Sequence, residues 1–425
     1  MIAACFCAVA GLHAQTYTVK DLGTLGGKGS APYSLNSSGI VVGNSSIADE
    51  NARSRPTRFS GTGSGNLDLG TLGGSGGFAT AINDSGTIVG QSNIAGDDVI
   101  HATRFSSTGS ANKDLGTLGG SGSQANAINS KGVIVGYAYQ VRPAGAINVI
   151  RHATRFSGTG SGNKDLGTLG GYNSTALDIN DSGVIVGEAT LIGSLNFDGE
   201  SHAVRFSGTG SGNTDLGTLG GTTSRAIAIN ATGTIVGYAS TGNGASHATR
   251  FREPGTGNID LGTLGGSSSE ASDINDSGVI VGYSTLKGDA AFHAFVHRNG
   301  KMIDLNTLIP ANSGVTLVGA AAINKSGQIA ATGLISASGE FHAVRLDLVP
   351  EPTVKYKITA TASPSGKGGV KGAGTFKKGK TITLTATPKA GAKFVKWTEK
   401  GNTVSTKKVY SFKVTKARTL VAHFK

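Results

Sequence analysis

Six histidines recur at one position of an internal repeat, and their imidazoles are the first groups in the chain that invite a chemical role. They are His101, His152, His202, His247, His293 and His342. Imidazoles can bind a metal ion or change their charge near neutral pH. Equivalent positions of a closed repeat lie too far apart to share one ion, however, and no carboxylate keeps a ligand spacing with these histidines. We therefore expect a structural role and predict no metal site.

Tyrosines, an arginine and carboxylates concentrate in the segment that follows each Ile-Val-Gly step of the repeat. Tyrosine rings stack on sugars, and polar groups beside them orient a ligand. The candidate ligand-binding residues are Tyr137, Tyr139, Arg142, Glu188, Asp198, Glu200, Tyr238 and Tyr283. Glu188 with Asp198 or Glu200 would also suit a glycosidase or lyase, which needs two carboxylates about 5–10 Å apart. The simpler interpretation is solvated turns in which the tyrosines fill the edge of a sheet.

A third repeated set consists of arginines, each three residues after the histidine position. They are Arg58, Arg104, Arg155, Arg205, Arg250 and Arg345. An aspartate in a repeated Asp-Leu-Gly motif lies on the strand that should pair with theirs. The pattern predicts an Arg–Asp ion pair in each repeat, which near the surface would contribute under about 1 kcal/mol.

The Asp-Leu-Gly motif opens a heptamer, DLGTLGG, that recurs about every 47 residues and indicates a repeat architecture. Six copies begin at Asp21, Asp68, Asp114, Asp165, Asp215 and Asp260, and a degraded copy, DLNTLIP, begins at Asp304. The glycines do not predict a nucleotide site, because phosphate loops require a following helix and, in the Walker motif, a lysine. The Asn-Asp-Ser-Gly turns lack the alternating carboxylates of a calcium loop. We predict no cofactor.

Each repeat contains four segments with the composition of β-strands, in one copy His152–Phe156, Lys164–Leu169, Ala176–Asn180 and Val184–Gly187. All are alternating or β-branched and bounded by Gly, Ser, Asn or Asp. Four antiparallel strands in each of seven units predict an all-β fold, a seven-bladed β-propeller over residues 15–348. The first unit lacks its leading His-Ala strand and the last such strand is left over, so joining the N- and C-terminal strands would close the ring. An open β-solenoid is the alternative.

Length variation is concentrated in one connection of the repeat. The segment between the Ile-Val-Gly step and the next His-Ala strand has 9 to 15 residues, whereas the other spacings stay nearly constant until the last unit. All copies of one connection emerge on one face of a propeller, and loops that carry function tolerate changes in length. We therefore predict that this face holds the ligand.

The His-Ala starts resemble those of the HAF family of bacterial extracellular repeats, which is named for a His-Ala-Phe start. His293-Ala294-Phe295 matches that start, the other histidine copies read His-Ala-Thr or His-Ala-Val, and Arg55-Pro56-Thr57 departs from it. The resemblance covers about Asp21 to Leu348. It implies an extracellular or envelope location and brings no established activity.

Residues 1–14, MIAACFCAVAGLHA, are predicted to form a signal peptide, apolar and ending in a small residue before Gln15. The segment lacks a basic start, as it would if the natural signal were longer. Both cysteines, Cys5 and Cys7, lie in it, so the mature chain would have none. That excludes disulfides, thiol nucleophiles and zinc-thiolate sites. No later segment approaches the roughly 18 apolar residues of a membrane span, and we expect a secreted or cell-surface protein.

The net charge of +12 is unevenly distributed along the chain. Val354 to Lys425 contain 16 Lys and one Arg against one acidic residue, a net +16, and the rest has 21 basic and 25 acidic residues, a net −4. A boundary is therefore expected at residues 349–354, where two prolines make a stiff linker. Residues 355–425 form the predicted basic β domain, with strands at Tyr356–Ala362, Thr381–Thr387, Lys393–Trp397, Tyr410–Val414 and Thr419–Phe424.

The basic domain resembles the divergent internalin-type bacterial B-repeat, a small β module of surface proteins. The resemblance rests on the Phe394-Val-Lys-Trp397 step, on Tyr410-Ser-Phe and on the final Ala-His-Phe. Because these aromatic residues suit a small core, we expect no specific nucleic-acid partner. The candidate contacts to an anionic envelope or matrix polymer are Lys377, Lys378, Lys380, Lys407 and Lys408. A solubilising face without a partner is the alternative, as is an internal contact with the acidic loops.

Together these patterns predict a monomeric binding or scaffold protein without enzymatic activity. The propeller loops would contact a polysaccharide or a protein partner, and the basic module would adhere to anionic polymer. A carbohydrate-active enzyme, a glycosidase or lyase on the same loops, is the alternative function.

Overall fold

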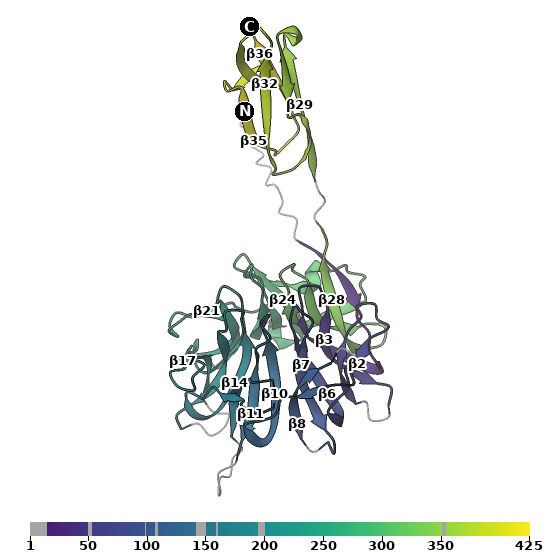
Figure 1. Cartoon of the computed structure of the whole chain (residues 1–425), viewed down its shortest axis with the longest axis vertical. Coiled ribbons are helices and arrows are strands. Elements are labelled where there is room, and N and C mark those ends of the chain that lie inside the picture. The colour runs from purple at the N-terminus through teal and green to yellow at the C-terminus, as the bar shows by residue number, and fades with distance from the viewer. Residues whose placement is uncertain are drawn as a thin grey trace. The chain divides into compact units, whose positions relative to one another are not determined.

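The computed structural model describes residues 15–49, 53–97, 99–106, 109–141, 150–158, 160–193, 200–350 and 354–425. This part of the chain consists of β-strands and three short 3-10 helices, with no α-helix (Figure 1). The all-β prediction is confirmed. The chain divides into two compact units between Val349 and Pro350. The predicted signal peptide, residues 1–14, lies outside the described residues, and within them no helix is long and apolar enough to cross a membrane.

The first unit contains seven antiparallel sheets of four strands, numbered here 1 to 7 along the chain. The first strands of the sheets are β2 (Gly26–Leu35), β6 (Gly73–Ile82), β10 (Gly119–Ile128), β14 (Gly170–Ile179), β18 (Gly220–Ile229), β22 (Gly265–Ile274) and β26 (Val315–Ile323). The second strands are β3 (Val41–Ile47), β7 (Ile88–Ile94), β11 (Ile134–Gln140), β15 (Ile185–Leu191), β19 (Ile235–Thr241), β23 (Ile280–Leu286) and β27 (Ile329–Ile335).

The third strands carry the His-Ala positions. They are β4 (Ser54–Arg58), β8 (Ile100–Phe105), β12 (Arg151–Phe156), β16 (Ser201–Phe206), β20 (Ser246–Phe251), β24 (Phe292–Arg298) and β28 (Glu340–Leu348). The fourth strands are β5 (Leu67–Asp68), β9 (Lys113–Asp114), β13 (Lys164–Asp165), β17 (Thr214–Asp215), β21 (Ile259–Asp260), β25 (Lys301–Asp304) and β1 (Tyr17–Asp21). Two 3-10 helices, η1 (Lys287–Asp289) and η2 (Leu305–Leu308), interrupt the last repeats.

Sheet 7 combines strands from both ends of the first unit. Its fourth strand is β1, which pairs antiparallel with β28 from Tyr17 opposite Leu348 to Asp21 opposite Val344. In Figure 1 the purple β1 accordingly runs beside the green β28. The strand left over at the end of the repeats is thus the partner of the strand that begins them.

Each sheet has two distinct ends, which we name the asparagine edge and the variable edge. At the asparagine edge the first strand turns into the second through an Asn-x-x-Gly turn, in which Gly183 (φ 87°) donates its N–H to the Asn180 carbonyl at 2.9 Å. A positive φ is what glycine supplies at such a turn. At the variable edge the second strand ends and the third begins, and the first strand also starts there, with Gly170 opposite Leu191.

Seven buried asparagines connect the sheets at the asparagine edge. The Nδ2 of each donates to the backbone carbonyl of the next, at 3.0–3.4 Å, in the order Asn36, Asn83, Asn129, Asn180, Asn230, Asn275 and Asn324. The series then returns, because Asn324 donates to the Asn36 carbonyl at 3.0 Å. Each sheet thus contacts the next, and sheet 7 contacts sheet 1.

The hydrophobic core lies between neighbouring sheets. One cluster joins Ala127 and Val135 of sheet 3 to Ile179 and Phe206 of sheet 4, and the other clusters repeat this arrangement. The many fully buried alanines let adjacent sheets approach closely, which explains how a chain with 37% hydrophobic residues fills a core. Another cluster contains Leu22 and Phe59 of the first repeat with Ala330 and Ala343 of the last.

The strand boundaries differ from the predicted ones in a consistent way. The first strand of sheet 4 begins at Gly170 instead of Ala176, and the second strand continues to Leu191 instead of Gly187. The fourth strand of sheet 3, β13, contains only Lys164–Asp165 instead of running to Leu169. The Gly-rich start was not expected in a strand, yet a Cβ on Gly171 would lie 2.5 Å from the Leu191 carbonyl oxygen. Glycine is present because the two backbones approach so closely.

The second unit is a separate β module with its own core around Trp397, Leu384 and Leu420. One sheet has the order β31 (Gly374–Lys377), β29 (Lys355–Ser363), β36 (Arg418–Phe424), β33 (Phe394–Glu399) and β34 (Asn402–Ser405), in which β29 and β36 are parallel. The other contains β30 (Gly368–Lys371), β32 (Thr381–Pro388) and β35 (Val409–Lys413), and η3 (Ser365–Lys367) precedes β30. Sequence analysis missed the three shortest strands, β30, β31 and β34.

Candidate functional site

The heptamer carries the chain from one sheet to the next. Asp165 ends β13, the fully buried Leu166 donates its N–H to the Ala153 carbonyl of the same sheet at 2.9 Å, and Gly170 begins the next sheet. The Asp165 Oδ1 accepts the N–H of Gly167 at 2.7 Å, which holds the turn. The repeated motif therefore serves the junction between sheets.

The repeated histidines form hydrogen bonds with the heptamer aspartates. Each histidine Nδ1 lies 2.7–2.9 Å from an aspartate oxygen, in the pairs His101–Asp114, His152–Asp165, His202–Asp215, His247–Asp260, His293–Asp304 and His342–Asp21. The sequence did not reveal these contacts, because the heptamer aspartates were expected to pair with the arginines instead. In sheet 1, Arg55 stands at the histidine position and takes the place of the imidazole. Its Nε lies 2.9 Å from the Asp68 carboxylate.

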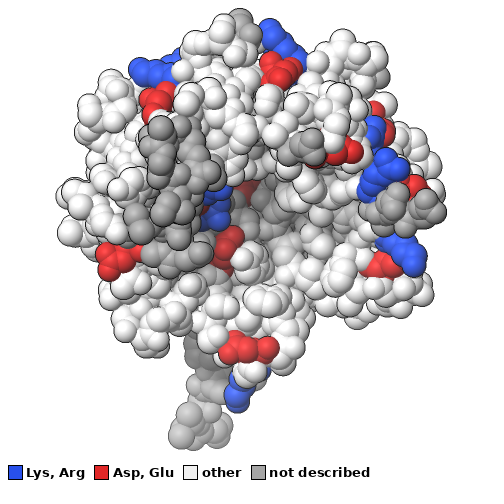
Figure 2. Space-filling view, turned by 90° about the horizontal axis from the view of Figure 1, so that it is seen from below, with Lys and Arg blue, Asp and Glu red and all other residues white. Residues whose placement is uncertain are grey.

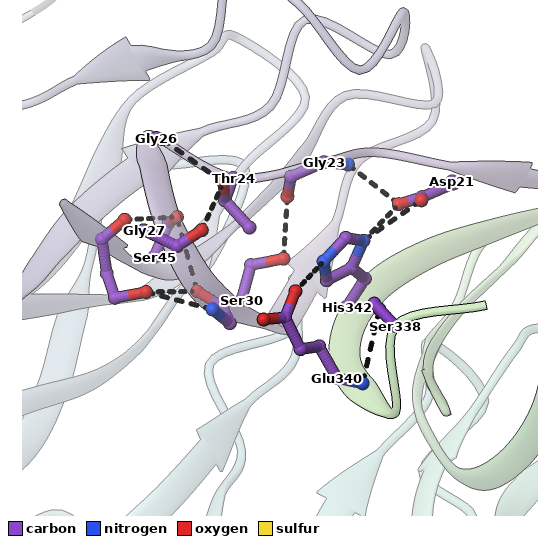
Figure 3. Close-up of polar contacts among 12 residues, drawn as sticks. Asp21, Gly23, Thr24, Gly26, Gly27, Ser30, Ser45, Ser338, Glu340 and His342 are labelled. Carbon is purple, nitrogen blue, oxygen red and sulfur yellow. Dashed lines mark hydrogen bonds and ion pairs between the residues drawn. The ribbon is translucent and has the colours of Figure 1, made fainter. Parts of the chain in front are cut away.

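Figure 3 shows the pair that joins the two ends of the first unit. Asp21, at the end of β1, accepts from the Gly23 N–H at 2.8 Å and contacts His342 of β28. Beside it, Ser30 of sheet 1 donates its hydroxyl to the Gly23 carbonyl at 2.6 Å and accepts the Ala343 N–H of sheet 7 at 2.9 Å. Ser123, Ser174, Ser224 and Ser269 make the same two bonds elsewhere. The junction between sheets 7 and 1 thus repeats the contacts of the other junctions.

The predicted pairing of arginines with heptamer aspartates was wrong. In the register of sheet 4, Asp215 lies opposite Val204, and Arg205 lies opposite Thr214. Successive side chains point to opposite faces of a strand, so His202 shares a face with Asp215 and Arg205 does not. Arg205 Nε lies 2.6 Å from Glu253, and Arg345 forms two bonds with Asp347. No described ion pair joins this set to a heptamer aspartate.

The imidazole–carboxylate pairs do not form a metal centre by themselves. Among the described residues there is no group of three or more His, Cys, Asp or Glu that could hold an ion. Although burial opposes ionisation, hydrogen bonds from His152 and from the Gly167 N–H lower the pKa of Asp165, and His202 and Gly217 do the same for Asp215. The pairs act as structural contacts between strands.

The candidate ligand-binding residues lie in strands more often than in loops. Tyr137 and Tyr139 are in β11, Glu188 in β15, Tyr238 in β19 and Tyr283 in β23, because the second strands extend past the Ile-Val-Gly step. Glu200 is exposed just before β16, where its carbonyl accepts the Leu191 N–H at 3.1 Å. Arg142 and Asp198 lie outside the described residues.

The first residue after each Ile-Val-Gly step faces a residue of the first strand in the same register, and we call these the cross-strand pairs. They are Ala31–Asn44, Phe78–Gln91, Gln124–Tyr137, Thr175–Glu188, Arg225–Tyr238, Glu270–Tyr283 and Gly319–Thr332 in sheets 1 to 7. The sequence candidates Tyr137, Glu188, Tyr238 and Tyr283 belong to this set. The first-strand partners of these four residues were not recognised from the sequence, although each is the variable residue x of a repeated Ser-x-Ala step.

The cross-strand pairs of sheets 4 to 6 form a continuous polar network. Arg225 Nε lies 3.6 Å from Glu188 Oε2 of the preceding sheet, and Tyr283 donates its hydroxyl to Glu270 at 2.8 Å. Burial raises the pKa of Glu270, despite the opposing effects of Tyr283 and Arg225. Burial also raises the pKa of Tyr238, although the charge of Arg225 acts against the rise. A guanidinium thus lies among carboxyl and phenol groups supplied by three sheets.

A cavity of about 480 Å³ lies beside this network, and the first strands of all seven sheets line it. Asp178 and Asp273 lie on its wall, where four other sheets have alanine and sheet 1 has Ser34. Asp178 accepts the N–H groups of Ile179 and Ile229 at 2.8 Å, and Asp273 bonds Ile274 and Ile323 in the same way. Desolvation raises the pKa of Asp178 to about 7 and that of Asp273 to about 6.

Sequence analysis did not select these two carboxylates. The sequence feature that distinguishes them is an aspartate in place of the second alanine of the Ala-x-Ala-Ile-Asn step, at Asp178 and Asp273. A comparison among the repeats would have identified both positions. It would not have shown that they face a shared cavity.

Exposed apolar side chains gather at the variable edge. They are Ile100, Val141, Tyr172, Ile192, Phe292 and Phe341. In the described part of the first unit, the other exposed large apolar residues are Tyr33, which lines the cavity, and Val349 at the end of the unit. Figure 2 views the unit from the variable edge and shows a central hollow that contains charged atoms of both signs.

The five candidate lysines of the second unit are all exposed, and they fall into two groups. Lys377, Lys378 and Lys380 surround the turn before β32, whereas Lys407 and Lys408 precede β35. Thr381 pairs with Lys413 and Thr385 with Val409, so the groups lie at opposite ends of one strand pairing. The aromatic residues expected in the core, Phe394, Trp397, Tyr410 and Phe412, belong to it.

A family model of the divergent InlB B-repeat domain matches residues 358–425. The match covers nearly all of the second unit and agrees with the resemblance found in the sequence. A comparison with curated proteins found no match.

Proposed function

We propose that the protein is a non-enzymatic binding protein of the bacterial surface or extracellular space. In this proposal the first unit is a closed seven-bladed β-propeller whose variable edge binds a ligand or partner, and the second unit adheres to anionic polymer. The B-repeat match is compatible with a surface or extracellular protein. The resemblance of the His-Ala repeats to HAF proteins supports the same location.

Three features support the propeller. Sheet 7 uses strands from both ends of the unit, the asparagine series returns from Asn324 to Asn36, and one cavity is lined by all seven first strands. A ring leaves no terminal sheet with an uncovered face, whereas an open solenoid has two terminal faces to cover.

The observation that carries the binding function is the one-sided distribution of apolar surface. Phe292 and Phe341 are half-exposed and Ile192 is 83% exposed, all at the edge where the connections vary in length. Keeping large apolar side chains in water costs free energy, and grouped exposure of this kind typically marks a contact surface. Variable length in the same connections is what binding loops tolerate.

The binding face is tested with the full chain on an array of neutral, acidic and amino-sugar glycans. We expect bound glycans to be lost in the double variant Phe292→Ser/Phe341→Ser. The matched control Val395→Ser/Val409→Ser, which replaces exposed apolar residues of the second unit, should retain them. Equal binding by both variants would show that the variable edge is not the contact surface.

The adhesive role of the second unit follows from its charge of +16 and its exposed lysines. Such a charge attracts anionic polymers, and screening by salt weakens the attraction. Full-length protein should sediment with polyglutamate-coated beads at low salt and release as salt rises. The variant Lys377→Gln/Lys378→Gln/Lys380→Gln should bind more weakly, whereas Lys113→Gln/Lys164→Gln, in the first unit, should not. Binding that is unchanged in the triple variant at low salt would contradict the role.

A carbohydrate-active enzyme is the second candidate. Burial raises the pKa of Glu270, and the nearby carboxyl group of Glu188 raises it further. A carboxyl group of raised pKa beside a second carboxyl group is the arrangement of a glycosidase. The sequence suggested Glu200 as a partner of Glu188, but Glu200 is exposed before β16. Glu270 is therefore the second carboxyl group in this candidate site. Release of reducing sugar from a glycan panel, abolished in Glu270→Gln, would support catalysis. No turnover on any glycan would exclude it.

A further inference from the structure

The cross-strand pairs are the place where the repeats differ in chemistry while their surroundings stay the same. A serine precedes and an alanine follows Gln124, Thr175, Arg225 and Glu270, and a glycine precedes each second-strand partner. The backbone register is also the same in these sheets. A structural requirement common to all sheets would select one residue type, as it does at the asparagines. The variety of residue types at the cross-strand pairs therefore indicates a role in binding, not in holding the sheets together.

The pairs lie next to the cavity, on its side toward the variable edge. Along each first strand the order from the asparagine edge is the asparagine, then the residues that line the cavity, then the pair residue. Gln124 donates to Asn126, a lining residue, at 2.8 Å, and Phe78 packs edge to face on Tyr33, another lining residue, at 6.2 Å. A ligand that entered from the variable edge would meet the pairs first.

Two buried polar groups in the pairs of sheets 4 to 6 have incomplete hydrogen bonding. Thr175 is only 2% exposed, and its Oγ1 has no partner among the described residues. Arg225 Nε is likewise buried without a hydrogen bond in that part of the chain, since its 3.6 Å approach to Glu188 is too long for one. An unsatisfied buried polar group destabilises the folded protein. Such a cost is expected where a ligand completes the bonds.

The surrounding groups define the chemistry of that ligand. The guanidinium of Arg225 lies near both Glu188 and Glu270, so the site presents mixed charge. An anionic ligand would meet two carboxyl groups, and a cationic ligand would meet the guanidinium. Hydroxyl groups both donate and accept, and can therefore satisfy Thr175, Arg225 and Glu188 together. Tyr238 and Tyr283 supply rings on which a sugar can stack.

We propose that the cross-strand pairs of sheets 4 to 6 form a binding site for a neutral saccharide at the mouth of the cavity. This deepens the proposed function, because it names the ligand class for the same edge. The sugar hydroxyls complete the bonds of Thr175 Oγ1 and Arg225 Nε. The exposed apolar residues of the variable edge contact the rest of a longer chain.

The test uses the full chain and the neutral hexasaccharides cellohexaose, xylohexaose, maltohexaose and chitohexaose, with hexagalacturonate as the anionic comparison. Calorimetry should detect binding of at least one neutral sugar. Thr175→Val keeps the shape of the side chain and removes the unpaired hydroxyl. We expect it to weaken binding about tenfold and to raise the thermal midpoint of the free protein, because it removes an unsatisfied group. Arg225→Gln should also weaken binding, and Gln91→Ala in sheet 2 is the matched control.

Three outcomes would overturn the inference. They are the absence of binding to every neutral hexasaccharide, a preference for hexagalacturonate, and full affinity in a folded Thr175→Val protein. A lower thermal midpoint in Thr175→Val would also count against it, since the hydroxyl would then have a structural partner. If Thr175→Val keeps array binding that Phe292→Ser/Phe341→Ser loses, the variable edge still binds and only the saccharide site is wrong.

Discussion

Two sets of aspartates in the same repeats respond to pH in opposite directions. Asp165 and Asp215 accept hydrogen bonds from histidines and from backbone N–H groups, which outweigh burial and lower their pKa. Asp178 and Asp273 face the cavity, where desolvation outweighs similar backbone bonds and raises their pKa to about 7 and about 6. The deciding difference is a histidine partner, which only the first set has, and the charge of Asp273 raises the pKa of Asp178 further.

The cavity aspartates should make the first unit less stable as pH rises. Their pKa is higher in the folded than in the unfolded chain, so the folded state binds more protons between about pH 4 and 7 and the free energy of unfolding falls across that window. Asp178→Ala/Asp273→Ala, which installs the alanine of other repeats, should flatten this part of the profile. Urea unfolding at pH 4.5 and 8 measures it. Identical slopes for both proteins would contradict the raised pKa values.

The histidine-paired aspartates should act at lower pH. Their pKa is lower in the folded state, so their stabilisation is present above the unfolded pKa near 4 and is lost as pH falls through the folded pKa. Asp165→Asn should therefore lower the thermal midpoint at pH 7 by an amount equivalent to about 1 kcal/mol or less, and the difference from wild type should shrink at pH 3. A difference that grows toward pH 3 would show that the pair does not stabilise the fold.

The glycine of the heptamer is required by a contact between repeats. Gly116 has φ 69°, and a Cβ there would lie 2.4 Å from the Gly160 carbonyl oxygen of the next repeat's loop. Gly116→Ala should cost roughly 2–4 kcal/mol of unfolding free energy. Gly132→Ala is the control, because its φ of 77° is similar but nothing lies within 4 Å of the added Cβ. It should cost only about 1 kcal/mol. Equal losses would show that backbone strain alone explains the glycine.

At the scale of elements, the turn at the asparagine edge both ends a strand and binds the next sheet. The Asn129 Oδ1 accepts the N–H groups of Lys131 and Val133 at 3.1 and 2.9 Å, while its Nδ2 donates to the Asn180 carbonyl at 3.1 Å. Few other side chains offer an acceptor and a donor at this separation. This dual use explains why the residue recurs in all seven sheets.

Replacing that asparagine should weaken the unit as a whole. Asn129→Ala leaves buried N–H and carbonyl groups without partners, and we expect a loss of about 1–3 kcal/mol. The exposed neighbour Ser130 bonds Asp181 through its backbone N–H, so Ser130→Ala should have little effect. Chemical unfolding followed by circular dichroism compares the two. A stable Asn129→Ala protein would mean that the series of asparagines is not a major contact.

At the scale of the whole molecule, the first unit depends on the pairing of β1 with β28. This pairing joins residues more than 300 positions apart and uses the same His–Asp and Ser contacts as the local junctions. Without it, β28 would present an unpaired edge, which promotes association between molecules. The first unit should therefore behave as one cooperative structure.

Disrupting β1 tests this dependence. Thr18→Pro places a residue that cannot donate a backbone hydrogen bond in the middle of β1, and should cost about 3 kcal/mol or more. Gln15→Pro, just before the strand, is the control. We expect a lower urea midpoint and concentration-dependent association for Thr18→Pro alone, measured by light scattering. An unchanged, monomeric Thr18→Pro protein would show that the pairing is dispensable.

Sequence alone determined the local parts of this molecule. Strand composition, Asn-x-x-Gly turns, a charge boundary near residue 350 and five of the eight strands of the second unit could be read from the sequence, because they depend on neighbouring residues. The split first unit also indicated which terminal strands would pair. Strand lengths were underestimated where glycine replaces β-branched residues, since the cause is a close approach of two backbones that composition does not record.

Only the tertiary structure decided which side chains meet. The register sets His152, and not Arg155, on the face of Asp165, and a shift of one residue would have reversed that choice. Tyr238 and Glu188 were selected from their segments, but Arg225 and Glu270 come from the first strands and join them only when three sheets pack side by side. Asp178 and Asp273 acquire raised pKa values only by burial beside the cavity that the first strands of all seven sheets line. Contacts between repeats depend on packing geometry, which a single repeat does not contain.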